Sequence, residues 1–115
     1  MHELTLTQSL VDRVADATAG RRVSAVHVRV GLLSGVVPEA MEFCFDVVTS
    51  GGPLDGAALL VERVPGRISC RTCGAESATE DLLLVCGCGS ADVAIVAGQE
   101  LTLTRVELVR ETSCA

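Results

Sequence analysis

Apolar residues recur at helical spacing near the start of the chain. Over residues 3–19 they fall at intervals of three and four, which places them on one stripe of a helix. The stripe consists of Leu6, Leu10, Val11, Val14 and Ala17. Glu3 lies in the predicted first turn, where the helix dipole favours an acid, and Gly20 suits the helix end. We therefore expect a helix that begins almost at the N-terminus.

The pattern changes to strict alternation over residues 22–33. One set of alternate positions is apolar and comprises Val26, Val28, Val30 and Leu32. The other set comprises Ala25, His27, Arg29 and Gly31. A period of two is typical of a strand that is buried on one face. We expect such a strand here, with His27 on its polar face.

A second helical pattern covers residues 38–49. It starts at Pro38, which suits the first position of a helix because its φ is already fixed and no N–H is needed there. The apolar stripe comprises Met41, Cys44, Phe45 and Val48. Glu39 and Glu42 lie near the start, and we interpret them as a solvated face that suits the helix dipole. The glycines and proline at 51–53 predict the end of the helix.

Three further segments have strand patterns, at residues 57–64, 92–98 and 101–109. The elements therefore run helix, strand, helix, strand, a cysteine-rich segment, and strand. The economical arrangement of these elements is a three-stranded sheet with two helices on one face. The strands on either side of the cysteine-rich segment could then pair as neighbours.

Composition narrows the possible functions. The chain has 115 residues, of which 49% are apolar, with two Phe and no Tyr or Trp. The shortage of aromatic rings argues against binding to single-stranded nucleic acid, which uses them as stacking platforms. The net charge of −6 and the pI near 4.7 disfavour nucleic acids and anionic membranes as partners.

The sequence shows no run of the roughly 18 apolar residues that a membrane span needs. It also shows no basic and then apolar leader of the secretory type. We expect a cytoplasmic protein. In that compartment six cysteines are metal ligands or free thiols more often than disulfides.

Four of the cysteines form two close pairs. Cys70 and Cys73 belong to a CxxCG turn, in which Gly74 allows a tight backbone, and Cys86 and Cys88 follow after a spacer of hairpin length. Two such pairs are the pattern of a structural four-cysteine zinc site, a zinc ribbon. Four thiolates leave no open position on the ion, so we expect a structural role for the metal.

The second pair, Cys86 and Cys88, is one residue shorter than a CxxC pair. In an extended strand the side chains of residues i and i+2 point the same way, so both sulfurs can still face one ion. Disulfides, redox-active thiols and tolerated cysteines are the alternatives. We expect Cys44 to be a small buried apolar residue and Cys114, in the tail, not to be a ligand.

The chain opens with Met1-His2-Glu3. Methionine aminopeptidases remove Met only before a small residue, so Met1 should be retained ahead of His2. The Met1 α-amine, the deprotonated His2 amide and the His2 imidazole Nδ1 can then bind one ion, with a fourth donor from the Glu3 amide or carboxylate. Nitrogen-rich tetragonal sites suit Ni(II) and Cu(II). The alternative is that Glu3 only begins a helix.

Taken together, these stretches resemble the HypA/HybF family of hydrogenase nickel-incorporation proteins, over nearly the whole chain. The matching stretches are MHE at the start, the S-L-V of the first helix, VHVRVGLLSGVVPEAMEFCF, VERVPGRISCRTCG, and CGS followed by an L-x-L-x-x-x-E-L strand. In the family the second cysteine pair is normally CxxC. Because Cys88-Gly89-Ser90 matches the end of that motif, Cys86 is the displaced ligand.

The resemblance implies a nickel metallochaperone of [NiFe]-hydrogenase maturation, and not an enzyme. It places Ni(II), the transient cargo, on Met1, His2 and Glu3. It places structural Zn(II) on Cys70, Cys73, Cys86 and Cys88. The implied partners are the nickel-handling GTPase HypB and the [NiFe]-hydrogenase large-subunit precursor, and the chain would be a monomer or a homodimer.

We therefore predict an α+β fold: a small three-stranded sheet with two helices on one face, plus an inserted four-cysteine zinc-ribbon module. The predicted nickel-binding domain comprises residues 1–67 and 99–110, the zinc-binding module residues 68–98, and the tail residues 111–115. Two rival functions remain at this point. One is a zinc-ribbon protein-interaction module without metal delivery, and the other is a thiol redox protein.

Overall fold

The computed structural model describes residues 2–79 and 82–109, which fold into two compact units. The first unit comprises the described residues up to Val28, then Val37–Val61, and those from Leu103 onward. The second comprises Arg29–Val36 and the described part of Glu62–Thr102. Helices and strands are both present, and the predicted α+β class is confirmed.

The first unit contains both helices, α1 (His2–Ala17) and α2 (Pro38–Thr49), which pack against each other. Helix α2 has the predicted bounds. Helix α1 ends two residues earlier than predicted, because the chain turns at Gly20, whose φ is +74° and whose N–H bonds to the Ala15 carbonyl at 3.0 Å. A glycine adopts this left-handed conformation without steric cost.

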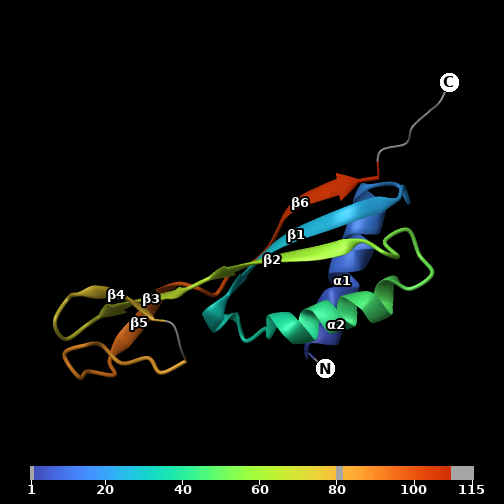
Figure 1. Cartoon of the computed structure of the whole chain (residues 1–115). Helices are drawn as coiled ribbons and strands as arrows, with labels where there is room; N and C mark the ends of the chain where they lie inside the picture. The colour runs from blue at the N-terminus through green and yellow to red at the C-terminus, as the bar shows by residue number, and fades with distance from the viewer. Residues whose placement is uncertain (1, 80–81, 110–115) are drawn as a thin grey trace. The chain divides into compact units, whose positions relative to one another are not determined.

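The sheet that runs through the first unit is formed by β1 (Val23–Gly31), β2 (Ala58–Val64) and β6 (Leu101–Leu108). Figure 1 shows α1 and α2 on the same side of this sheet. The core of the unit is built from apolar side chains of both helices, β1 and the loop after α2. Its most buried members are Val14, Val26, Val28, Met41, Phe45 and Leu54.

The order of strands in this sheet is β2-β1-β6. The sequence allowed β2 and β6, the strands on either side of the cysteine-rich segment, to pair as neighbours. They do not pair, because β1 lies between them. The physical reason lies in the composition of the strands. Strand β1 carries the buried valines and takes the centre, whereas no residue of β2 or β6 is fully buried.

The second unit contains a second sheet, of which the sequence predicted only one strand, the one expected at residues 92–98. It has the order β4-β3-β5 and is formed by β3 (Gly66–Cys70), β4 (Glu76–Thr79) and β5 (Val93–Ala97). Strand β3 pairs antiparallel with both neighbours, with Ser69 opposite Glu76 on β4 and Cys70 opposite Val93 on β5. A short 3-10 helix at Leu32–Ser34 follows β1. The predicted cysteine module thus folds on a three-stranded frame.

Three glycines in the second unit allow backbone segments to touch. A Cβ atom on Gly31 would overlap the carbonyl of Gly98, and one on Gly98 would overlap the backbone of Gly66. The contact is closed by hydrogen bonds of 2.7 Å from the Leu33 N–H to the Gly98 carbonyl and from the Gly31 N–H to the Glu100 carbonyl. This glycine contact joins the end of β1 to the start of β3.

None of the helices within residues 2–79 and 82–109 is long and apolar enough to cross a membrane.

We predict that Gly98→Ala lowers the free energy of unfolding by about 2 kcal/mol or more, because the new methyl group meets backbone and φ is +103°. Gly52→Ala is the matched control. Its Cβ would lie 3.7 Å from the nearest atom and its φ is not in the left-handed range. Urea unfolding curves should show a change of at most about 0.5 kcal/mol for the control. Equal losses for the two variants would contradict the steric role of Gly98.

Candidate metal centre

The first cysteine pair lies on a tight turn at the end of β3. The Gly74 N–H bonds to the Cys70 carbonyl at 2.9 Å, and the Cys70 N–H bonds to the Ala75 carbonyl at 2.8 Å. Gly74 has a φ of +78°, which lets the backbone close the turn directly after Cys73. The turn therefore holds both sulfurs of the CxxC pair on one side.

The second pair lies on the same kind of turn with one residue fewer. The Gly89 N–H bonds to the Cys86 carbonyl at 2.8 Å, and the Cys86 N–H bonds to the Ser90 carbonyl at 2.8 Å. Each of these bonds spans one residue less than its counterpart in the first turn. Gly89, directly after Cys88, again has a positive φ, of +93°. The pair therefore lies in a turn, and the extended geometry that we considered possible for it is not the one adopted.

Polar side chains next to the two turns fasten them to each other. The Thr72 and Ser90 hydroxyls lie 2.8 Å apart, and the Arg71 guanidinium donates to the Asp92 carboxylate at 2.9 Å. The Arg71 N–H also bonds to the Asp92 carbonyl at 3.0 Å. The side chains between Cys70 and Cys73 thus hold the segment that follows Cys88. Surface ion pairs contribute little individually, but together these bonds fix the spacing of the two turns.

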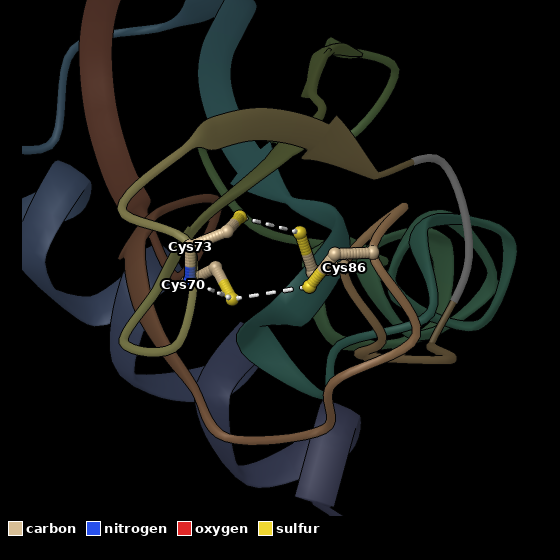
Figure 2. A group of neighbouring side chains, drawn as sticks. Cys70, Cys73 and Cys86 are labelled. Atoms are coloured by element: carbon tan, nitrogen blue, oxygen red, sulfur yellow. Dashed lines mark hydrogen bonds between the residues drawn. The ribbon is translucent and has the colours of Figure 1, made fainter.

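The four sulfurs meet in one cluster. Those of Cys70 and Cys88 lie 3.7 Å apart, and those of Cys73 and Cys86 lie 3.6 Å apart. All four lie within 4.8 Å of one another. Figure 2 shows the labelled side chains, Cys70, Cys73 and Cys86, pointing toward one another from the two turns. The two cysteine pairs therefore lie together, as the sequence predicted.

The cluster is asymmetric in burial and in proton affinity. Cys70 and Cys86 are buried, whereas Cys73 and Cys88 are exposed. The Cys73 N–H, 3.4 Å from the Cys70 sulfur, is the main cause that lowers the pKa of the Cys70 thiol from 9.0 to about 6. The Ala75 N–H lowers the pKa of Cys73, but the sulfurs of Cys86 and Cys70 outweigh it and the net pKa is raised.

The donor set fits zinc. Zinc bound tetrahedrally to sulfur at about 2.3 Å has sulfur–sulfur separations of about 3.8 Å. The separations of 3.7 Å between Cys70 and Cys88 and of 3.6 Å between Cys73 and Cys86 are close to that value. Four thiols are also the most common all-sulfur set for structural zinc, and they would leave no position for a substrate. The site is therefore a four-cysteine metal site of the closed kind.

The N-terminal residues belong to the first unit. Met1 lies outside the described residues, and His2 begins α1. Glu3 is half-buried in the first turn of α1, and its carboxylate accepts the Val37 N–H at 3.3 Å. Val37 is the residue that precedes α2, and no side chain of its own caps that helix. Glu3 therefore links the start of α1 to the start of α2.

The remaining histidine and two cysteines were not expected to be ligands. Nε2 of His27 lies 2.7 Å from a carboxylate oxygen of Glu107, on β6, and this hydrogen bond lowers the pKa of the Glu107 carboxyl. His27 thus has a structural partner. Cys44 is half-buried on α2, which is less burial than we expected. Cys114 lies outside the described residues.

A small α+β protein with a closed four-thiol site and no open coordination position is a metal-binding protein whose site is built to hold an ion rather than to perform catalysis. The sequence agrees with this class and narrows it. The chain matches, over residues 1–108, the family described as hydrogenase/urease nickel incorporation, metallochaperone, hypA. The chain belongs to this HypA family of metallochaperones and is not an enzyme.

Individual relatives agree with the assignment. The chain is 44% identical over 109 residues to the hydrogenase maturation factor HypA of Geobacter metallireducens, covering 94% of this chain and 99% of that one. It is 40% identical over 108 residues to the HypA of a Nostoc species, covering 94% and 96%. The matches extend over nearly the full length of these relatives, so the family resemblance is not confined to the cysteine segment.

Solved structures of the family share the fold. The solution structure of the Ni metallochaperone HypA from Helicobacter pylori superposes with a TM-score of 0.60 at 22% identity, covering 95% of this chain and 98% of that one. The solution structure of another HypA protein gives a TM-score of 0.57 at 20% identity. At these identities the likeness concerns the fold alone.

The polar residues that fasten the two turns were missed in the sequence. Arg71 and Thr72 were treated as spacers within CxxC, Ser90 as the end of the CGS motif, and Asp92 as the first residue of the strand predicted at 92–98. Their position in the sequence was the available clue. Hydroxyl and charged residues lie directly beside both cysteine pairs, and they can form hydrogen bonds across the site when the two pairs face each other. Such outer bonds commonly hold metal ligands in orientation.

We predict that the metal-free, reduced protein develops thiolate absorbance in the ultraviolet with a first step near pH 6. Cys70→Ser should abolish this step, and Cys44→Ser should leave it intact. Because the folded pKa of Cys70 lies below its unfolded value of 9.0, its contribution to stability is complete above about pH 9 and is lost as pH falls through about 6. A first step that survives Cys70→Ser would assign the low pKa to another thiol.

Proposed function

We propose that this protein is a nickel metallochaperone that binds Ni(II) at its N-terminus and delivers it, in the cytoplasm, during maturation of [NiFe]-hydrogenase. The observation that carries the proposal is the family match over residues 1–108, which includes the terminal Met1-His2-Glu3 as well as the cysteine site. The proposed nickel ligands are Met1, His2 and Glu3. The proposed zinc ligands are Cys70, Cys73, Cys86 and Cys88.

The chemistry of the N-terminus favours nickel over zinc. The Met1 α-amine, the His2 amide nitrogen and the His2 imidazole Nδ1 close a five-membered and a six-membered chelate ring around one ion. A donor set rich in nitrogen with planar geometry suits Ni(II) and Cu(II), whereas thiolates in a tetrahedron suit zinc. The two sites would therefore select different metals by geometry and ligand type.

The position of these residues in α1 is favourable for coordination. The first four N–H groups of a helix have no carbonyl acceptor within that helix. The amide N–H groups of His2 and Glu3 therefore make no hydrogen bond within the helix that metal binding would have to break. One carboxylate oxygen of Glu3 accepts the Val37 N–H, which favours the Glu3 amide over its carboxylate as the fourth donor.

Delivery would proceed by exchange of ligands and not by catalysis. A site at the end of the chain is open on one side, so a partner can add donors before the first ones leave. The proposed partners are the nickel-handling GTPase HypB and the [NiFe]-hydrogenase large-subunit precursor. The zinc would add to the stability of the second unit, because structural zinc binding contributes folding free energy directly.

We predict one Ni(II) site per chain on untagged protein with its native terminus. His2→Ala should weaken nickel binding at least about tenfold, because it removes the imidazole donor. His27→Gln, which changes the other histidine, should leave it within about twofold. The chain contains no lysine, so acetylation with an amine-selective reagent blocks the terminal amine alone, and it should also abolish the site. Isothermal titration measures all four forms.

Protonation of the His2 imidazole and of the terminal amine competes with nickel, so the affinity should fall steeply below about pH 6.5. Titrations between about pH 8 and about pH 5.5 test this. Nickel affinity that stays flat over this range, or that survives both acetylation and His2→Ala, would remove the N-terminus as the nickel site. The zinc-ribbon interaction module without metal delivery would then be the better description of the protein.

We predict that the purified protein holds about one zinc per chain and that Cys86→Ser lowers this content strongly, because a thiolate of the tetrahedral set is lost. Cys44→Ser is the matched control and should retain the full content. Atomic emission after extensive dialysis gives the ratio. Full zinc content in Cys86→Ser, with loss in Cys88→Ser, would mean that the shortened pair supplies only one ligand.

A further inference from the structure

The outer face of α2 exposes large apolar side chains on a helix that is otherwise well packed. Phe43 is 70% exposed and Val47 is 56% exposed. They are four residues apart, so they lie next to each other on the helix surface. The inner face of the same helix packs into the core, since Met41 and Phe45 are each only 1% exposed. Phe43 and Val47 are therefore mostly open to solvent in the first unit.

The exposed aromatic ring stands out against the composition of the chain. There are only two Phe, with no Tyr and no Trp. One of the two, Phe45, fills the core, and the other faces solvent. A single exposed apolar residue is ordinary on a protein surface. An aromatic ring and a valine side by side form a small patch, which more often marks contact with another molecule.

An acidic stripe runs beside this patch. Glu39, Glu42 and Asp46 are exposed, and at about 100° per residue they occupy one side of the outer face, while Phe43 and Val47 occupy the other. Helix α2 contains no basic residue. Among the residues that the structure describes, the ion pairs do not include Glu42 or Asp46. The stripe is thus not neutralised by the helix itself.

We propose that this surface, the α2 face formed by Glu39, Glu42, Phe43, Asp46 and Val47, docks a basic amphipathic helix of a partner protein. The apolar side of such a helix would cover Phe43 and Val47, and its Lys or Arg side chains would meet the acidic stripe. Helices that lay an apolar face against a partner surface and pair their charges beside it are a common mode of recognition. This inference goes beyond the proposed function, because it does not depend on nickel or zinc chemistry.

The charge argues against a second copy of this chain as the occupant. A two-fold contact through the α2 face would place the same patch on both copies. The acidic stripes would then lie close together in a chain whose net charge is already −6. A partner segment of opposite charge removes this repulsion and gains attraction, and the attraction should weaken with salt.

The test uses the full zinc-loaded chain and a fluorescein-labelled peptide of about 18 residues, composed of Leu and Lys with the leucines on one helical face. We expect saturable binding by fluorescence anisotropy. Phe43→Ser with Val47→Ser should weaken it at least about tenfold. Glu42→Gln with Asp46→Asn should weaken it and reduce its salt dependence. Backbone amide shifts in NMR should change along α2 when the peptide is added, which tests the location without any variant.

Two controls separate the effect of the α2 face from general effects of charge and of apolar content. Asp12→Asn with Asp16→Asn removes the same charge from exposed positions of α1 and should change affinity by at most about twofold. A peptide of identical composition without an apolar face should bind weakly to every form. Three results would overturn the proposal: no saturable binding, equal binding to all variants, or a dimer that Phe43→Ser with Val47→Ser converts to monomer. Circular dichroism confirms that each variant keeps its helices.

Discussion

Four thiols held this close together cannot all ionise unless a cation joins them. At separations of 3.6 and 3.7 Å, each thiolate raises the cost of forming the next. The Ala75 N–H lowers the pKa of Cys73, but the neighbouring sulfurs of Cys86 and Cys70 outweigh it, so the net pKa of Cys73 is raised. The second unit has few other buried side chains, with Ile68 as its largest. Cross-linking by a divalent ion would therefore supply much of the order that a larger domain takes from an apolar core.

The two cysteine turns are alike, although the second pair is one residue shorter than the first. The backbone bonds of the first turn recur in the second, each spanning one residue fewer, and a glycine with positive φ follows the second cysteine in both. The second pair therefore forms the same kind of turn with one residue fewer between its cysteines. The sulfur of Cys86 still reaches that of Cys73, which fits its assignment to the set.

Much of the first unit could be predicted from periodicity. Helix α2 was predicted to the residue, because Pro38 marks its start and the glycines after Thr49 its end. Strand β1 was predicted by its alternating valines. The strand order could not be predicted in the same way, since β2 and β6 carry similar patterns and only burial distinguishes the central strand.

The sheet of the second unit was missed for a different reason. Strands of four and five residues, such as β4 and β3, carry too few positions for a pattern to emerge, and they are held by the turns at either end. Within the metal centre the meeting of the four cysteine side chains was predictable from their spacing alone. The bonds between Thr72 and Ser90 and between Arg71 and Asp92 depend on tertiary approach, which spacing does not specify.

The hydrogen bond from the Val37 N–H to the Glu3 carboxylate has a thermodynamic consequence. It connects the segment proposed to carry nickel with the helix proposed to meet a partner. A metal ion that binds the Glu3 amide and shifts this residue would lengthen the bond at the N-terminus of α2, and a partner that orders this end of α2 would strengthen it. Metal binding and partner binding are then thermodynamically linked. The factor by which the metal changes the affinity for the partner equals the factor by which the partner changes the affinity for the metal. Through this single hydrogen bond, metal binding at the N-terminus would change the affinity of α2 for a partner.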